Sequence, residues 1–307
     1  MTAVALVGVT ASGKSEAVLA LARRRSDVEI VSVDSMCVYR EMDLGTSKPS
    51  RAVRDEVPHH MIDLVDPAEE FTVAEFQREA RDALHQIEQR GHHAVLVGGT
   101  GLYLRSVIDD LSIPGRFPEV VSELESALDA GEVDVPDLHA RLATLDPVAA
   151  QRMEPTNRRR IVRALEVTIG SGQPFSHFGP GLEAYPPSKF PLFGIEIANE
   201  DVDRRIGERF AGWMSEGFLN EVQALAARPA GISRTARQAL GYRELLTHVE
   251  DGADLDVCVE EAIRRTRTLA RRQASWFRRD PRIAWSPPGA GPVDLLDQAL
   301  GAHGSRP

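Results

Sequence analysis

Eight consecutive residues near the N-terminus have the spacing of a phosphate-binding loop. They are Gly8, Val9, Thr10, Ala11, Ser12, Gly13, Lys14 and Ser15. The glycines allow backbone N–H groups to converge on phosphate oxygens, and the N-terminus of a following helix adds a positive dipole end. Lys14 supplies a point charge, and the Ser15 hydroxyl is a suitable ligand for Mg²⁺. This pattern predicts a di- or triphosphate site with Mg²⁺ as cofactor, but it does not specify which bond breaks.

Two further polar residues follow runs that are typical of buried strands. Asp34 follows the apolar run 28–33, and Thr100 follows the run 94–97 within a stretch that contains Gly98, Gly99 and Gly101. Ligands bind at the carboxyl ends of parallel strands, so both side chains are expected to face the phosphate loop. Three glycines in four residues would let the backbone approach a ligand closely. The alternatives are a turn or helix cap at Asp34 and a plain tight turn around Thr100.

The elements that must position these residues indicate an α/β fold. Strand-like runs at 3–8, 28–33, 94–97 and 192–197 alternate with helical patterns, which predicts a P-loop NTPase-like parallel sheet flanked by helices. Thr72 and Glu75 form a capping box that opens a helix ending near Arg90. Residues 113–185 are rich in helix starts and prolines and are expected to form an all-helical insertion. The core would then comprise residues 1–112 and 186–307, with a loose Gly/Pro-rich tail from about 287.

The charge distribution is more informative than its sum. The net charge of −10 argues against nucleic acid, yet residues 264–282 contain eight arginines and one acid. A second cluster comprises Arg158, Arg159, Arg160 and Arg163. Basic clusters of this density suggest contacts with phosphates, and a solvated helix face is the alternative.

Other features exclude several classes of protein. Two cysteines, Cys37 and Cys258, provide no disulfide framework, and the apolar runs are too short to span a bilayer, so a cytoplasmic location is expected. The pairs His59-His60 and His92-His93 lack the companion ligands of a zinc site and are interpreted as structural.

Several stretches together resemble one family, the tRNA dimethylallyltransferases, also called tRNA isopentenyltransferases. The matching stretches occur in the family's order and cover most of the chain. They are 8–15, 34–40, 45–49, 59–63, 98–105, 159–167, 238–244 and 271–278.

The resemblance implies an activity and partners. Such an enzyme transfers a dimethylallyl group from dimethylallyl diphosphate to N6 of the adenine next to the anticodon, in tRNAs that read codons beginning with U, and releases diphosphate. The helical insertion would clasp the tRNA anticodon stem-loop. No membrane and no obligate protein partner are expected, and the enzyme would act as a monomer.

The resemblance also implies residue roles. Asp34 would accept the proton of the adenine amine, Thr100 would lie beside the reacting centre, and Lys14 and Arg209 would hold the diphosphate. The residues that match tRNA-contacting segments are Asp34, Ser35, Met36, Cys37, Thr100, Arg159, Arg160, Ile161, Val162, Arg163, Gln238, Ala239, Leu240, Gly241, Tyr242 and Arg243.

This sequence departs from the family pattern at three places. Val9 replaces the usual proline of the phosphate-binding loop and is expected at the surface. Cys37 replaces the usual glutamine, and no arginine aligns in the stretch 117–121, although Arg116 lies next to it. The alternative functions are an adenylate isopentenyltransferase that accepts free AMP, a small-molecule P-loop kinase, and a non-enzymatic nucleotide switch, for which the base-reading motif is absent.

Overall fold

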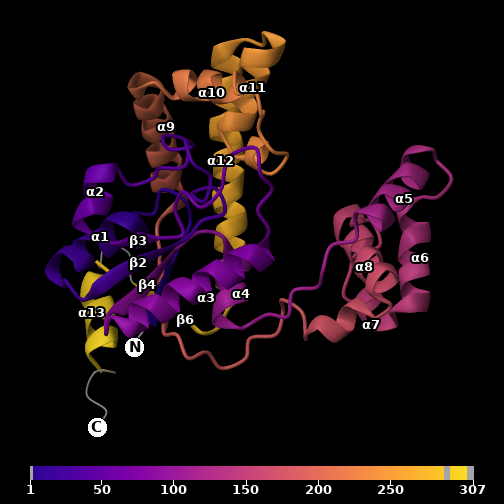
Figure 1. Cartoon of the computed structure of the whole chain (residues 1–307), viewed down its shortest axis with the longest axis horizontal. Helices are drawn as coiled ribbons and strands as arrows, with labels where there is room; N and C mark the ends of the chain where they lie inside the picture. Colours follow the sequence, from indigo (N-terminus) through magenta and orange to yellow (C-terminus); the bar gives the residue numbers. More distant parts are fainter. Residues whose placement is uncertain (1–2, 287–290, 303–307) are drawn as a thin grey trace. The chain divides into compact units, whose positions relative to one another are not determined.

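A computed structural model of the chain describes residues 3–286 and 291–302. The chain divides into two compact units, each with its own core (Figure 1). The first unit comprises Met1–Asp109 with Pro187–Pro307, and the second comprises Asp110–Pro186.

The first unit is built on a parallel sheet of six strands among the described residues, in the order β3-β2-β4-β1-β5-β6. The strands are β1 (Ala3–Val7), β2 (Val28–Val33), β3 (His59–His60), β4 (His93–Gly98), β5 (Leu192–Ile195) and β6 (Ile283–Ser286). The predicted α/β class with a parallel sheet is confirmed. The sequence pattern did not reveal β3 or β6, because strands of two and four residues are too short to show a periodicity.

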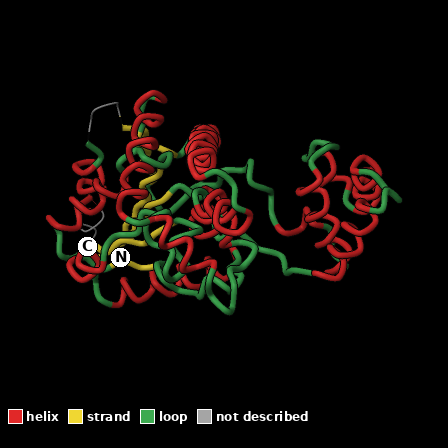
Figure 2. Tube along the Cα trace, turned by 90° about the horizontal axis from the view of Figure 1, so that it is seen from above, coloured by secondary structure: helices red, strands yellow, loops and turns green. Residues whose placement is uncertain are grey.

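Helices cover both faces of this sheet (Figure 2). They are α1 (Lys14–Arg24), α2 (Arg51–Glu56), α3 (Val73–Gln89), α4 (Gly101–Ile108), α9 (Asn199–Glu216), α10 (Phe218–Ala226), α11 (Tyr242–Asp251), α12 (Leu255–Arg278) and α13 (Val293–Ala302), with a 3₁₀ turn at Ala236–Gln238. The capping box predicted at the start of α3 is present: Glu75 N donates to Thr72 Oγ1 at 3.3 Å, and Thr72 N donates to Glu75 Oε2 at 2.7 Å.

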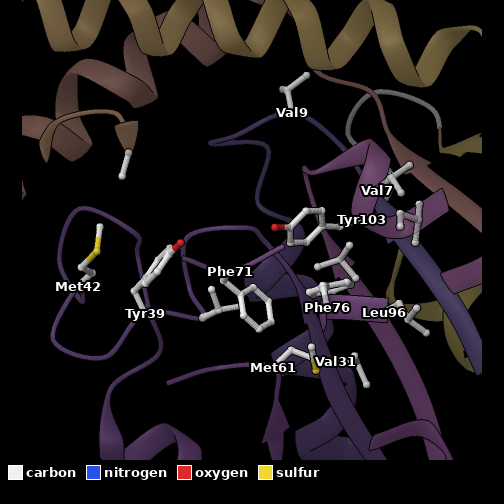
Figure 3. Close-up of a cluster of buried hydrophobic side chains, with 14 of the residues drawn as sticks. Val7, Val9, Val31, Tyr39, Met42, Met61, Phe71, Phe76, Leu96 and Tyr103 are labelled. Atoms are coloured by element: carbon white, nitrogen blue, oxygen red, sulfur yellow. The ribbon is translucent and has the colours of Figure 1, made fainter. Parts of the chain in front are cut away.

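Alternate residues of the strands fill two separate cores. In β1, Val4 and Leu6 pack with α1 and α13, whereas Ala5 and Val7 belong to the core on the opposite face. This second core includes Phe76 of α3 and Tyr103 of α4, whose ring centroids lie 4.4 Å apart (Figure 3). The rigid sheet fixes the carboxyl ends of its strands, and the polar loops begin there.

The second unit is a small helical bundle. Its helices are α5 (Pro118–Asp129), α6 (Val135–Leu145), α7 (Pro147–Gln151) and α8 (Arg158–Ser171), followed by a 3₁₀ turn at Phe175–Phe178. Side chains cap the helix starts: Ala149 N donates to Asp146 Oδ1 at 3.0 Å, and Arg160 N donates to Asn157 Oδ1 at 3.3 Å. Leu142 and Ile161 are fully buried between α6 and α8.

The loose tail predicted from about residue 287 is wrong for the segment that forms α13, which packs on the sheet. Residues 287–290 and 303–307 lie outside the described residues. Leu296 and Leu300 are fully buried because they lie four residues apart on one helix face. None of the helices within the described ranges combines the length and apolarity that crossing a membrane requires.

Candidate active site

The phosphate-binding loop joins β1 to α1 and has the backbone geometry of an anion cradle. Ala11 and Gly13 have φ values of +61° and +88°, and α1 begins directly afterwards at Lys14. Lys14 Nζ donates to Val9 O at 3.0 Å. The Ser12 hydroxyl is buried and has no hydrogen-bond partner among the described residues. A buried polar atom without a partner is costly, which fits a loop shaped for a bound group.

Two arginines of α9 reach this loop. Arg209 Nη1 donates to Thr10 Oγ1 at 3.4 Å, and Arg205 Nη1 donates to Ala11 O at 3.3 Å. Burial lowers the pKa of Arg209, and no carboxylate within the described residues lies at ion-pair distance from it. A largely buried cation without an ion pair is unfavourable unless an anion binds there.

Lys14 has an unusual ionisation. Its burial lowers its pKa from 10.5 to about 8; the negative charge of Asp34 raises it, and the positive charge of Arg209 lowers it. Asp34 acts on Lys14 because the two residues follow β2 and β1, parallel strands that end at the same edge of the sheet.

The loops of Asp34 and Thr100 are joined through Ser35, the residue that follows Asp34. Thr100 Oγ1 accepts a hydrogen bond from Ser35 N at 3.2 Å, and Thr100 N donates to Val33 O at 3.3 Å. Asp34 Oδ1 accepts from Met36 N at 2.8 Å, which stabilises the turn after β2. The structure therefore brings Lys14, Asp34 and Thr100 to one edge of the sheet, as their positions after β1, β2 and β4 predict.

The glycines around Thr100 make room for protein groups. A Cβ on Gly98 would lie 2.0 Å from Val33 O, and one on Gly99 would lie 2.4 Å from Gln273 Nε2. A Cβ on Gly101 would lie 2.0 Å from the indole nitrogen of Trp276. The sequence suggested close approach to a ligand, whereas the nearest atoms here belong to β2 and α12.

Val9 and Cys37 are buried. Val9 is 8% exposed and lies beneath α12 (Figure 3), so the expectation of a surface position is wrong. Cys37 is also buried, its thiol donates to Thr46 O at 3.6 Å, and burial raises its pKa. The Cys37 side chain is therefore poorly placed to touch an RNA.

Only part of the stretch 238–243 is accessible. Gln238 and Arg243 are exposed and Leu240 is half-buried. Ala239, Gly241 and Tyr242 are buried, and the Tyr242 hydroxyl donates to Glu221. Glu221 also accepts from Leu44 N at 2.9 Å, so this network fixes the turn that presents Gln238 and Arg243.

In the helical unit, α8 presents two of its predicted tRNA-contacting arginines. Arg159 and Arg160 are exposed, and neither has an ion pair within the described ranges. Ile161 and Val162 lie in the core of the unit, so their side chains are inaccessible. Arg163 is occupied: its guanidinium donates to Pro114 O at 2.8 Å and pairs with Glu166 at 2.7 Å.

Most arginines of residues 264–282 are neutralised within the protein. Arg264 and Arg265 pair with Glu261 at 2.6 and 2.5 Å, and Arg271 pairs with Asp203 at 2.7 Å. Arg282 pairs with Asp109 and Asp280, each at 2.6 Å. The stretch 264–282 excludes Glu261, which lies one helical turn before Arg264 and Arg265. The count of charges in that stretch therefore overstated the free positive charge.

Lys48 has a structural role and joins two loops. Its buried ammonium donates to Asp63 Oδ1 at 2.6 Å and to Asp43 Oδ1 at 2.9 Å. These bonds tie together the loops that follow β2 and β3.

The histidine pairs also have structural surroundings. His60 Nε2 lies 2.6 Å from Glu29 Oε2, and His92 Nδ1 lies 2.8 Å from Glu29 Oε1. Arg90 completes the network with a bidentate contact to the same carboxylate. No cluster of three His, Cys, Asp or Glu side chains suited to a metal ion occurs among the described residues.

Comparison with known proteins identifies the family of the chain. The family model described as IPP transferase matches residues 37–280. The chain belongs to the IPP transferase family. The family match begins in the loop after β2 and runs through α12, so it includes Thr100 and Arg209, whereas Lys14 and Asp34 lie before its start.

Individual relatives match nearly the whole chain. The tRNA dimethylallyltransferase of Acidothermus cellulolyticus is 44% identical, over 99% of this chain and 92% of the relative. That of Kineococcus radiotolerans is 42% identical, over 97% and 95%. The crystal structure of the full-length tRNA isopentenylpyrophosphate transferase from Bacillus halodurans is 32% identical, with a TM-score of 0.69 and coverage of 98% and 96%.

Sequence reasoning missed Arg205 and Gln273. Arg205 lies one helical turn before Arg209, and its contact with Ala11 O shows that it too reaches the phosphate-binding loop. Gln273 lies within the arginine-rich stretch of α12, which the sequence analysis interpreted by its charge alone. Its spacing of three from Trp276, which places both on one helix face, was the available signal.

Proposed function

We propose that this chain transfers a dimethylallyl group from dimethylallyl diphosphate to N6 of the adenine next to the anticodon of tRNA, and that it releases diphosphate. The observation that supports this proposal is the arrangement of side chains at the carboxyl edge of the sheet. Lys14 and Arg209 converge on the P-loop, and Asp34 lies within electrostatic reach of Lys14. A cationic cradle facing a carboxylate suits the departure of an anion and the deprotonation of an amine.

The P-loop side stabilises the leaving group. As the allylic C–O bond lengthens, positive charge spreads over the allyl carbons and negative charge grows on the diphosphate. The loop amides, Lys14 and Arg209 oppose that negative charge more strongly in the transition state than in the substrate. These groups are fixed before reaction, since Lys14 donates to Val9 O and Arg209 to Thr10.

Asp34 and Thr100, across the site from the P-loop, act on the nucleophile. An amine conjugated with the adenine ring is a poor nucleophile, so it needs orientation and a proton acceptor. Asp34 serves as this general base, with one carboxylate oxygen held by Met36 N. Thr100 fixes the adjacent loop by accepting from Ser35 N.

Ser15 fits a role in holding Mg²⁺ together with substrate. Mg²⁺ is usually bound by one or two protein oxygens, substrate phosphates and water, so a large carboxylate cluster is not needed. Ser15 is exposed at the first turn of α1, beside the cradle with its buried Ser12 hydroxyl. When bound, the ion would neutralise charge on the diphosphate.

The proposed tRNA contacts are the exposed members of the predicted stretches. Arg159 and Arg160 on α8, and Gln238 and Arg243 near α11, are available to phosphates or bases. The target adenine must leave the stacked anticodon loop to reach Asp34, and loop bases are the least costly to extrude.

We further propose that the enzyme acts as a monomer in the cytoplasm. All of the donor and acceptor groups named above come from a single chain. The cytoplasm contains tRNA, and a reducing compartment suits the free cysteines Cys37 and Cys258.

One labelling experiment separates the candidate functions. The protein is incubated with dimethylallyl diphosphate labelled in the prenyl group, together with unmodified tRNA or AMP. We expect label in tRNA and none in AMP. Label in AMP alone would indicate an adenylate isopentenyltransferase. Label in neither acceptor would reject prenyl transfer, and a parallel incubation with ATP labelled in its terminal phosphate would then test for a kinase.

A further inference from the structure

Gln273 of α12 hydrogen-bonds with two loops that carry opposite halves of the proposed site. Its Oε1 accepts from Thr10 N of the P-loop at 2.8 Å, and its Nε2 donates to Gly99 O at 3.0 Å. The backbone N–H can only donate and the carbonyl can only accept, so these partners fix the orientation of the amide. A carboxylate or an apolar side chain could not make both bonds.

The contact with Gly99 continues toward the proposed base. Gly99 precedes Thr100, whose hydroxyl accepts from Ser35 N, and Ser35 follows Asp34. Gln273 therefore begins a short chain of contacts that ends at the acceptor side. Its other bond ends in the P-loop, where Thr10 also contacts Arg209.

The close packing around Gln273 makes this link stiff. The side-chain amide occupies the space that a Cβ on Gly99 would need, at 2.4 Å from Nε2. One turn further along the helix, Trp276 packs against Gly101 in the same manner, at 2.0 Å from its hypothetical Cβ. Two side chains of one helix face thus press on the turn that carries Thr100.

We infer that Gln273 is a positioning residue that sets the distance between the leaving diphosphate and the accepting amine. This inference rests on the proposed function. Gln273 is assigned no contact with the reacting atoms, and it acts through Thr10 on one side and through Gly99 and Thr100 on the other. A displacement of about 1 Å between reacting groups can cost roughly 100-fold in rate, so a link of this kind affects chemistry more than binding.

Two substitutions test the two bonds. Gln273→Met keeps the length of the side chain and removes both hydrogen bonds. Gln273→Glu keeps an acceptor for Thr10 N, but the ionised carboxylate cannot donate to Gly99 O and repels it. Once protonated, the introduced carboxyl group can donate that bond. Ser275→Ala, an exposed change on the same helix, is the matched control.

The rate of prenyl transfer is measured in single turnover with saturating substrates, together with the KM for dimethylallyl diphosphate and for tRNA. Thermal unfolding checks that each variant folds. We expect Gln273→Met to lower the transfer rate by roughly 10- to 100-fold with nearly unchanged KM values. The rate of Gln273→Glu relative to the unmodified protein should rise as the pH falls from 8 to about 5, when the carboxyl group becomes protonated. Ser275→Ala should match the unmodified protein in every measurement.

Folded variants with unchanged transfer rates would overturn the inference. So would an effect confined to KM, or a relative rate of Gln273→Glu that does not depend on pH. If the unmodified protein itself labels no tRNA, the proposed function fails, and the role of Gln273 in it fails as well. Product from the unmodified protein with normal rates in the variants rejects the positioning role alone.

Discussion

The Thr100 hydroxyl accepts a hydrogen bond from the backbone N–H of Ser35 at 3.2 Å, and this bond joins the loop after β4 to the loop after β2. Asp34 immediately precedes Ser35, so the position of the proposed base depends on a side chain some 65 residues away in sequence. A threonine between glycines can therefore matter for the reaction without touching the proton that is transferred.

Replacing Thr100 tests this dependence. Thr100→Val preserves the shape and removes the acceptor, and we expect a loss of about 10-fold in the transfer rate, since an unpaired Ser35 N–H costs about 1–3 kcal/mol. Thr100→Ser should retain most of the rate, because it keeps the hydroxyl. Single-turnover labelling of tRNA measures both variants, and equal rates for the two would contradict the proposed link.

Asp34→Asn removes the proposed base with little change in shape. We expect the single-turnover rate to fall by about 10²- to 10⁴-fold, the usual effect of losing a general base. The tRNA affinity should change little, and a filter-binding measurement checks this. A transfer rate close to that of the unmodified protein would show that the proton goes to another group.

The depressed pKa of Lys14 predicts a pH dependence. Burial lowers this pKa to about 8, so the free protein loses the Lys14 charge as the pH rises through that value. We expect kcat/KM for dimethylallyl diphosphate to decline above pH 8, since this parameter reports the free enzyme. Lys14→Arg should lose this decline, because arginine stays charged, even if its rate is lower. The same decline in both proteins would assign it to another group.

The titration of Lys14 should make the protein more stable as the pH rises, whereas it lowers kcat/KM. Between pH 8 and 10.5 the unfolded chain binds more protons at this residue than the folded chain, so this group makes the free energy of unfolding rise with pH. Comparing denaturant unfolding of the unmodified protein and of Lys14→Met at pH 7 and pH 10 isolates the effect. Relative to Lys14→Met, the unmodified protein should have a higher free energy of unfolding at pH 10 than at pH 7. A difference between the two proteins that does not change with pH would contradict the depressed pKa.

The exposed arginines of α8 predict a salt dependence. Changing both Arg159 and Arg160 to glutamine should flatten the slope of log affinity against log salt by about one to two units, as expected for one or two lost phosphate contacts. Arg158→Gln is the control, because Arg158 pairs with Asp129 at 3.0 Å and contacts Glu125. An unchanged slope in the double variant would remove this face of α8 from the tRNA site.

The residues at the sheet edge could be predicted because each follows a strand with a strong local signal. Lys14, Asp34 and Thr100 lie after β1, β2 and β4, and the parallel arrangement alone places them together. The contact of Arg209 with Thr10 links residues 199 positions apart, so it came from the family resemblance and not from a local pattern. Gln273 shows the same limit, since its spacing from Trp276 indicates a shared helix face but not the two distant loops that its amide bridges.

Burial was the other property that the sequence could not supply. The stretch 159–163 reads as one basic motif, but the helix places Ile161 and Val162 in the core and leaves Arg159 and Arg160 exposed. Likewise, the acids that neutralise the arginines of α12 lie partly on another helix, as Asp203 of α9 does for Arg271. Free charge depends on such tertiary pairs, which a count along the chain does not include.

The most direct test of the account is to identify the product. Unmodified tRNA is incubated with dimethylallyl diphosphate and the protein, then digested to nucleosides and, separately, to sequenced fragments for mass spectrometry. We expect N6-dimethylallyladenosine at the position next to the anticodon, at a much lower level with Asp34→Asn. A tRNA that gains no prenyl group, or gains one at another position, would contradict it.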